Sequence, residues 1–192
     1  MKLFYIIFVV LYSTINRKIS DEKQNYFDIY NGKYMSSPRR IHLINVVKDF
    51  GINGDGKEDN TEGFKRVFNF VEKEILKQKK ERINGDNSFG VEIYIPPGVY
   101  ITGPFNLTSH VTLSLSSNAT IKALDTPRNF PLIDPLPSYG QGRDFKGPRR
   151  APFIGGFHLK DVVITKKVES LSVNSNATID GSGLNWWKNF RS

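Results

Sequence analysis

The sequence predicts an all-β fold that is preceded by one amphipathic helix. Apolar residues recur at helical spacing between residues 64 and 75, and from Gly90 onward the pattern changes to the alternation of β-strands. Turn-forming residues separate the short alternating segments, and no second helical stripe interrupts them. Two architectures satisfy this pattern: a sandwich of two sheets, or a solenoid of stacked coils in which each coil contacts only its neighbours.

Composition narrows the class of protein. The 192 residues suffice for one domain, and a hydrophobic fraction of 39% is too high for a disordered chain and too low for a polytopic membrane protein. The formal net charge of +8 favours an anionic partner, which could be nucleic acid, anionic lipid or acidic polysaccharide. The chain has no cysteine, so disulfides, a thiolate nucleophile and a cysteine-based zinc site are excluded.

Residues 1–19 have the features of a secretory signal peptide. Lys2 precedes an apolar run over residues 3–12, which is well short of the ~20 residues that a membrane-spanning helix needs. Secretion is the favoured interpretation, and an uncleaved anchor or a buried strand are the alternatives. Residues 20–40 are polar and rich in turn-forming residues, which predicts a linker in front of a domain over residues 41–192.

A glycine-rich loop opens this domain. Residues 49–56 place three glycines among Asn and Asp residues, a composition that predicts positive φ angles and a tight turn. The loop lacks the Gly-Lys-Ser/Thr ending of a phosphate-binding loop and the terminal Glu of an EF-hand. We therefore interpret it as a structural turn.

A helix is predicted near residues 60–80. The side chains of Asp59, Asn60 and Thr61 are suited to capping its first turn. Its apolar face is formed by Phe64, Val67, Phe68, Val71 and Ile75. The basic run over residues 77–80 suits a solvated helix end, where cations also complement the helix dipole.

Short strands follow the helix. Alternation predicts them within residues 91–95, 99–101, 105–107, 111–115, 119–123, 159–164 and 177–180. Between them, residues 131–143 are so rich in proline and glycine that they exclude a central strand or a helix. Long loops of this kind are often functional, and here a functional and a purely connecting role are equally favoured.

Several segments, taken in order, resemble pectin-lyase-like β-helix proteins and, more closely, the polygalacturonase family of glycoside hydrolases. The resemblance runs from about residue 43 to residue 188. It rests on residues 50–56 with 59–61, then 95–104, 132–140, 161–165 and 178–183, followed by Trp186-Trp187. The Pro-Leu-Pro-Ser-Tyr-Gly sequence within the third segment points to the plant-like and bacterial branch of the family.

The resemblance implies a right-handed parallel β-helix whose N-terminal end is covered by the amphipathic helix and which is incomplete at its C-terminus. An uncovered first coil would expose its strand edge and apolar interior to water. One departure from the family is visible, because twelve residues from Lys166 to Ala177 separate two strands that are close in sequence in relatives. Either a surface insertion or an error in the gene model explains them.

The family hydrolyses galacturonan with inversion, and its chemical motifs are missing from this sequence. They are an Asn-Thr-Asp motif, an Asp-Asp pair, a Gly-His-Gly motif and an Arg-Ile-Lys motif, all of which lie beyond the position of Trp187. The nearest match, Asn60-Thr61-Glu62, belongs to the predicted helix. The three histidines, His42, His110 and His158, have no flanking glycines. We therefore expect no catalytic residue, no cofactor and no metal site in this chain.

Other residues that could carry chemistry have simpler interpretations. Four aspartates could be proposed as an acid and a base, but each lies beside a predicted turn or strand end, where aspartate is usually a turn former. They are Asp134, Asp144, Asp161 and Asp180. Trp186 and Trp187 could stack on sugar rings, although packing is the favoured role.

Two function classes follow. In the first, the chain is the N-terminal fragment of a secreted polygalacturonase-like hydrolase that acts on pectin. In the second, it is a non-catalytic β-helix module that binds acidic polysaccharide through Arg143, Arg149 and Arg150. Nucleic-acid binding would need a motif that the sequence lacks. Three Asn-x-Ser/Thr triplets, at Asn106, Asn118 and Asn176, are candidate N-glycosylation sites.

Overall fold

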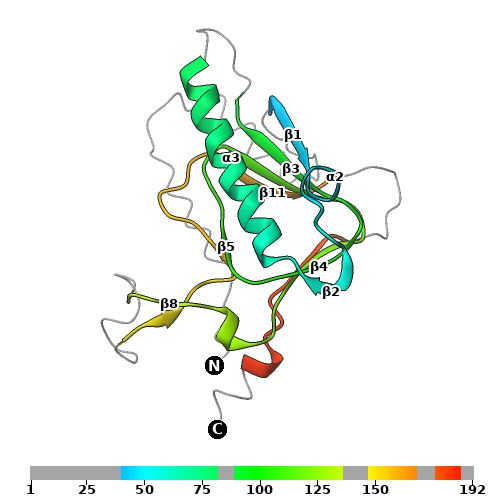
Figure 1. Cartoon of the computed structure of the whole chain (residues 1–192), viewed down its shortest axis with the longest axis vertical. Coiled ribbons are helices and arrows are strands. Elements are labelled where there is room, and N and C mark those ends of the chain that lie inside the picture. Colours follow the sequence, from blue (N-terminus) through cyan, green and yellow to red (C-terminus); the bar gives the residue numbers. More distant parts are fainter. Residues whose placement is uncertain (1–39, 82–88, 136–146, 168–175, 187–192) are drawn as a thin grey trace, which may run out of the picture.

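Short parallel strands stack around one apolar interior in the computed structural model, which describes residues 40–81, 89–135, 147–167 and 176–186 (Figure 1). One sheet has the order β1 (His42–Asn45), β3 (Val91–Ile95), β6 (Val111–Leu115) and β11 (Val162–Lys166). A second has the order β2 (Asp55–Asp59), β4 (Gly98–Thr102), β7 (Ala119–Ala123) and β12 (Thr178–Asp180). A third pairs β5 (Phe105–Asn106) with β10 (Ile154–Gly155). All pairs in these sheets are parallel, so the architecture is a parallel β-helix and not a sandwich.

Register aligns the inward-facing side chains of successive coils. Ile44 pairs with Ile93, Ile93 with Leu113, and Leu113 with Ile164, so one row of aliphatic side chains runs through four strands. Ile44, Ile93 and Leu113 are at most 1% exposed. Because strand side chains alternate between faces, the period-two pattern of the sequence places every second residue in this interior.

The predicted helix is α3, Thr61–Glu81, and its apolar face is buried as expected. Two of its phenylalanines stack on Phe105 of β5, with ring-centroid distances of 5.2 Å from Phe64 and 5.0 Å from Phe68. The first two sheets each begin with a strand that precedes α3, whereas the third begins with β5. The helix lies across β5 at that position (Figure 1). It therefore closes the side of the first coil that has no earlier strand.

Two elements between residues 46 and 59 were not predicted. A short helix, α2 (Val46–Phe50), begins where the Asn45 side chain accepts hydrogen bonds from the backbone N–H groups of Val47 and Lys48. It ends at Gly51, which has a φ of +66°. The polar residues of β2 carry no alternating apolar pattern, so the sequence gives no signal for this strand.

The glycine-rich loop makes the tight turn that the sequence predicts. Gly56 has a φ of +73°, which favours glycine. Gly54 is required for a different reason: a Cβ at this position would lie 2.8 Å from the ring of Tyr100. Asn60 holds the loop against α3, because its Oδ1 accepts from the Asn53 N–H at 2.9 Å and its Nδ2 donates to the Asn53 carbonyl at 2.8 Å.

The segment between β7 and β10 leaves the coil. It contains a 3-10 turn (Pro127–Asn129) and an antiparallel pair of short strands, β8 (Leu132–Ile133) and β9 (Arg149–Arg150). The proline-rich segment contributes only β8 among its described residues, so it forms no central strand, as predicted. Its residues 136–143 lie outside the described part, as do the predicted signal peptide, the linker up to residue 39 and residues 168–175 of the insertion.

The chain turns at an equivalent point in three coils. Gly90, His110 and Asp161 each precede a strand of the first sheet by one residue, and their φ values are +95°, +62° and +55°. A Cβ at Gly90 would collide with the carbonyl oxygen of His110, so the close approach of the two coils at this turn requires glycine. Positive φ at non-glycine residues costs free energy, and surrounding contacts must compensate for it.

Arg40 supplies contacts that span these turns. Its side chain is 2% exposed, and its donors bind the Thr112 hydroxyl (2.9 Å), the Phe89 carbonyl (3.2 Å), the Asp161 carbonyl (3.1 Å) and both Asp161 carboxylate oxygens (2.6 and 3.0 Å). These bonds use all five guanidinium N–H groups. The same carboxylate lies 3.1 Å from Nδ1 of His110. Arg40, the last residue of the predicted linker, is therefore an integral part of the domain.

The strands β11 and β12 end the two larger sheets on the side opposite β1 and β2, and among the described residues no strand pairs with their far edges. All five residues of β11 are half-buried, in contrast to the fully buried residues of β6. Within the described residues, no helix is both long and apolar enough to cross a membrane.

The first prediction concerns the Arg40 contacts. We expect Arg40→Ala to lower the free energy of unfolding by about 2 kcal/mol, because the hydrogen bonds of an almost fully buried guanidinium are lost, while the Asp161 carboxylate, which is 36% exposed, regains water. Arg40→Lys should recover only part of this loss, since lysine lacks the planar fork. The matched control is Lys65→Ala, which breaks an ion pair with Glu62 of similar length (2.7 Å) but high exposure, 53% and 74% for the two side chains. Its cost should stay below about 1 kcal/mol. Equal urea midpoints for Arg40→Ala and the control would contradict the prediction.

The second prediction concerns Tyr100, whose side chain is buried. Burial raises the pKa of Tyr100 to about 12 from its ordinary value of 10.0. The unfolded chain therefore loses this proton first, and the contribution of Tyr100 to stability is present below pH 10 and is lost as the pH rises toward 12. Tyr100→Phe should match wild type within about 1 kcal/mol at pH 7, because the tyrosine hydroxyl makes only a 3.4 Å hydrogen bond to the Pro97 carbonyl. Above pH 10 the variant should become the more stable protein in urea titrations; parallel pH profiles would show that this linkage is absent.

The third prediction concerns the open edge. We expect the 192-residue polypeptide to self-associate with increasing concentration in sedimentation experiments, because unpaired strand edges recruit further strands. Val163→Lys should weaken this association, since Val163 lies on an edge strand and faces away from the aliphatic row. Val99→Lys adds the same charge to the inner strand β4 and serves as the control. A protein that stays monomeric at every concentration would refute the expectation.

Candidate functional site

The predicted cationic residues lie on the ribbon of β8 and β9. Arg149 pairs with Ile133 and Arg150 with Leu132, and Nη1 of Arg150 donates to the Phe130 carbonyl at 2.9 Å. Successive side chains of a strand point to opposite faces, so the ribbon presents one arginine on each face. The third predicted cation, Arg143, lies outside the described residues.

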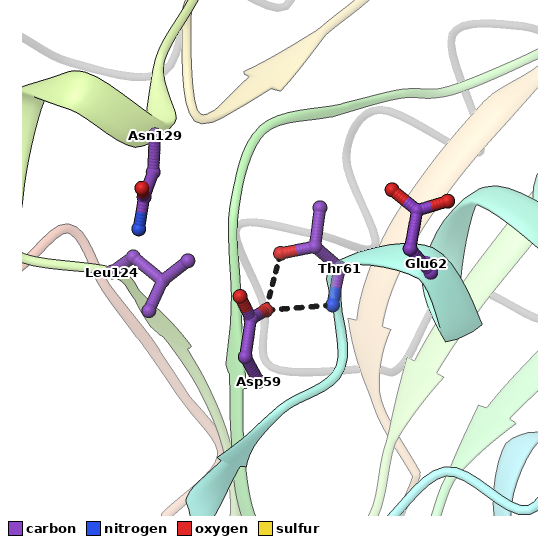
Figure 2. A pocket seen from close by; sticks show the side chains of 5 residues that line it. All are labelled: Asp59, Thr61, Glu62, Leu124 and Asn129. Atoms are coloured by element: carbon purple, nitrogen blue, oxygen red, sulfur yellow. Dashed lines mark hydrogen bonds between the residues drawn. The ribbon is translucent and has the colours of Figure 1, made fainter.

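A shallow pocket of about 210 Å³ lies at the N-terminus of α3 (Figure 2). It is lined by Asp59, Thr61, Glu62, Leu124 and Asn129. The Asp59 carboxylate accepts hydrogen bonds from the backbone N–H and the hydroxyl of Thr61, as the dashed lines in Figure 2 show. Two carboxylates in one small pocket repel an anionic sugar. This pocket, which we call the acidic pocket, is therefore unsuited to galacturonan.

The local geometry shows why these side chains meet. Asp59 caps the first turn of α3, as predicted, and the Thr61 hydroxyl accepts from the Gly103 N–H at 2.6 Å. Glu62 binds Nζ of Lys65 at 2.7 Å. Both carboxylates thus serve the helix end, and no group of three or more metal-ligating side chains forms among the described residues.

A second hollow, of about 380 Å³, lies between α3 and the turns that follow β5 and β10. We call it the α3 groove. It is lined by Phe68, Asn69, Glu72, Asn106, Leu107, Thr108, Ser109, Phe157 and Leu159. Sequence reasoning noted Asn106 as a glycosylation triplet but missed the groove, because its residues come from three separate segments.

The structure separates the candidate aspartates. Asp161 is engaged by Arg40 and His110, and Asp180 accepts from the Ser182 N–H at 2.8 Å in a local turn. Asp134 is exposed beside β8, and Asp144 lies outside the described residues. The three described aspartates thus belong to different elements, and none faces another as an acid faces a base. The Asp180 contact agrees with the predicted turn-forming role, whereas the contacts of the Asp161 carboxylate are with distant residues.

The electrostatics of the glycine-rich loop also argue against acid catalysis. The Asp55 carboxylate accepts from the N–H groups of Glu58 at 3.0 Å and Lys57 at 2.8 Å. These bonds hold the pKa of Asp55 below its usual value. A general acid in a glycosidase needs the opposite shift.

The remaining predicted residues have structural surroundings. The Trp186 ring packs edge-on against Phe130 at a centroid distance of 5.1 Å, in agreement with a packing role, and Trp187 lies outside the described residues. Asn118 follows β6 with a φ of +64°, and its N–H donates to the Asn176 carbonyl at 2.9 Å. These two glycosylation triplets therefore stack on each other in adjacent coils.

Comparisons with known proteins find a family model and relatives that match this chain. Residues 43–189 match the family model described as "Rhamnogalacturonase A/epimerase, pectate lyase-like". A probable polygalacturonase of Vitis vinifera is 38% identical over 158 residues, which cover 82% of this chain and 28% of the relative. The crystal structure of a hyperthermoactive exopolygalacturonase from Thermotoga maritima superimposes with a TM-score of 0.52 at 25% identity, and the match covers 83% of this chain and 29% of that one. The right-handed parallel β-helix predicted from the resemblance is thereby confirmed, and the chain spans less than a third of the length of either relative.

Proposed function

The chain belongs to the rhamnogalacturonase A/epimerase, pectate lyase-like family, and from this premise we propose that it is the N-terminal part of a secreted polygalacturonase-like hydrolase. The observation that carries the proposal is the ordered succession of the α3 cap and parallel coils within residues 43–189, over which the family model matches. The two relatives described above are named for activity on polygalacturonan, which supports a pectic substrate.

In this proposal the role of the chain is architectural. The α3 helix covers one end of the solenoid, and the unpaired edges of β11 and β12 are the surfaces on which further coils would be built. Further coils would carry the acid and base of an inverting hydrolase, whose carboxyl groups stand roughly 6.5–9.5 Å apart. By itself the 192-residue chain is inactive in this proposal, because it lacks the four motifs of the family, and because Asp161 and Asp180 are committed to an ion pair and a local turn.

Residues 1–19 direct the protein to the extracellular space in this account, where plant cell-wall pectin would be accessible. The apolar run behind Lys2 supports this step. Acidic polysaccharide is the expected partner, since the net charge of +8 favours polyanions.

A second candidate function is a non-catalytic module that binds acidic polysaccharide. The arginines of β9 favour it, because they stand on a ribbon that projects from the coil stack (Figure 1). Sequencing the transcript beyond Ser192 separates the two functions. The four catalytic motifs appear downstream under the first and are absent under the second.

The fourth prediction tests activity and binding together. Purified residues 20–192 should release no reducing ends from polygalacturonate above a boiled control. Weak binding to polygalacturonate should be detectable at low salt and lost at high salt, since exposed charges are screened within about 10 Å at 0.1 M. The double variant Arg149→Ala/Arg150→Ala should weaken it by about two- to tenfold.

The matched control is Lys79→Ala/Lys80→Ala, which removes the same charge from the end of α3. Equal losses in the two double variants would assign the binding to net charge alone. Turnover above the boiled control would show that the chain holds an active site of its own.

A further inference from the structure

The α3 groove combines an exposed aromatic ring with a glycosylation acceptor. Phe157 is 83% exposed, which is the highest value among the large apolar side chains that the structure describes. Its ring contacts the neighbouring His158 ring at a centroid distance of 3.9 Å, and most of its apolar surface remains open to water. Asn106 and Thr108, the first and third residues of an Asn-x-Thr triplet, line the same groove.

Asn106 is available for modification. It is the exposed second residue of β5, and its carboxamide makes no hydrogen bond with any described residue. The preceding residue, Phe105, is buried against α3, and this packing holds the backbone at Asn106 in place. Gly155 pairs with Asn106, and a Cβ at Gly155 would collide with Oδ1 of Asn106. The glycine therefore leaves room for this side chain at the entrance of the groove.

The other two triplets lie away from the α3 groove. Asn118 and Asn176 occupy equivalent turns of adjacent coils, which places them about 4.8 Å apart along the stack. Neither lines the α3 groove or the acidic pocket. Bulky sugars on both asparagines would therefore compete for the same space.

We propose that Asn106 carries an N-linked glycan whose first sugar residue lies in the α3 groove, with its C–H face against the ring of Phe157. The proposal rests on the secretion step of the proposed function, because the donor is a lipid-diphosphate-linked oligosaccharide of the secretory pathway. In the transfer, Nδ2 of Asn106 forms a bond to C1 of the sugar, the C1–O bond to the diphosphate breaks, and one Nδ2 proton passes to the transferase. The lipid diphosphate is the leaving group.

The groove chemistry suits a sugar. Leu107 and Leu159 add apolar surface to the same groove as Phe157, and aromatic faces pack favourably on apolar C–H surface. Asn69, Glu72 and Ser109 provide polar groups around this surface for sugar hydroxyl and N-acetyl groups. The glycan would thus cover an apolar patch beside the cap helix that no described protein segment covers.

The fifth prediction tests this site in the full chain, expressed in eukaryotic cells with an established signal peptide in front of residue 1. Peptide mapping after enzymatic deglycosylation in H₂¹⁸O should show the isotope-labelled Asp at position 106. Thr108→Ala should abolish this label, and the conservative Thr108→Ser should retain it. A glycan on Asn118 or Asn176 with none on Asn106 would overturn the proposal.

The variant Phe157→Ser tests whether the first sugar packs against the Phe157 ring. This exposed position can change without altering the core, so Asn106 should stay modified, while its glycan should be released from the native protein about three- to tenfold faster by a peptide-N-glycosidase. Leu132→Ser, at an exposed residue of β8 outside the groove, is the matched control and should leave the release rate unchanged. Equal rates in Phe157→Ser and wild type would show that the glycan does not occupy the groove.

The results of these two experiments do not depend on whether the proposed function is correct. The added signal peptide delivers the chain to the transferase even if residues 1–19 do not. Polygalacturonate binding is measured on unglycosylated protein, so its failure leaves the glycan assignment intact.

Discussion

The in-register pairing of parallel strands between successive coils is the constraint on which the rest of the structure depends. A strand in one coil finds its backbone partners only in the coils before and after it, so each coil is incomplete alone. The same register aligns Ile44, Ile93, Leu113 and Ile164 into one aliphatic row. The first coil therefore needs a cover, and α3 provides it by stacking Phe64 and Phe68 on Phe105.

A stack of coils also has to turn at the same place each time, and this is where polar chemistry is concentrated. His110 and Asp161 adopt positive φ values that glycine would adopt at lower cost, and Arg40 compensates with five hydrogen bonds in a buried position. Three of these bonds go to Asp161, which is 121 positions away in the sequence. A charged side chain thus ties the segment before β1 to the turn before β11, the fourth strand of the first sheet.

The surface divides into regions of different chemistry, which bears on function. Carboxylates line the pocket at the start of α3, arginines stand on the β8–β9 ribbon, and the α3 groove combines an exposed ring with polar groups, of which Glu72 is the acidic one. Of these three regions, the ribbon is the one whose charge favours a polyanion. Asp161 and Asp180 lie elsewhere, and their carboxylates hold an ion pair and a local turn.

Local pattern was sufficient to predict α3, most strands and the turn at residues 49–56, because helical spacing, alternation and glycine content are properties of adjacent residues. The handedness and the parallel stacking followed only from the family resemblance, since alternation is the same in a sandwich and a solenoid. The α2 helix and β2 were missed, because one is a single capped turn and the other has no apolar face. Tertiary structure alone decided the role of Arg40, the need for glycine at position 54 beside the Tyr100 ring, and the placement of Asn106 and Phe157 in one groove. Each of these depends on residues brought together from distant segments, and a contact of that kind leaves no periodic trace in the sequence.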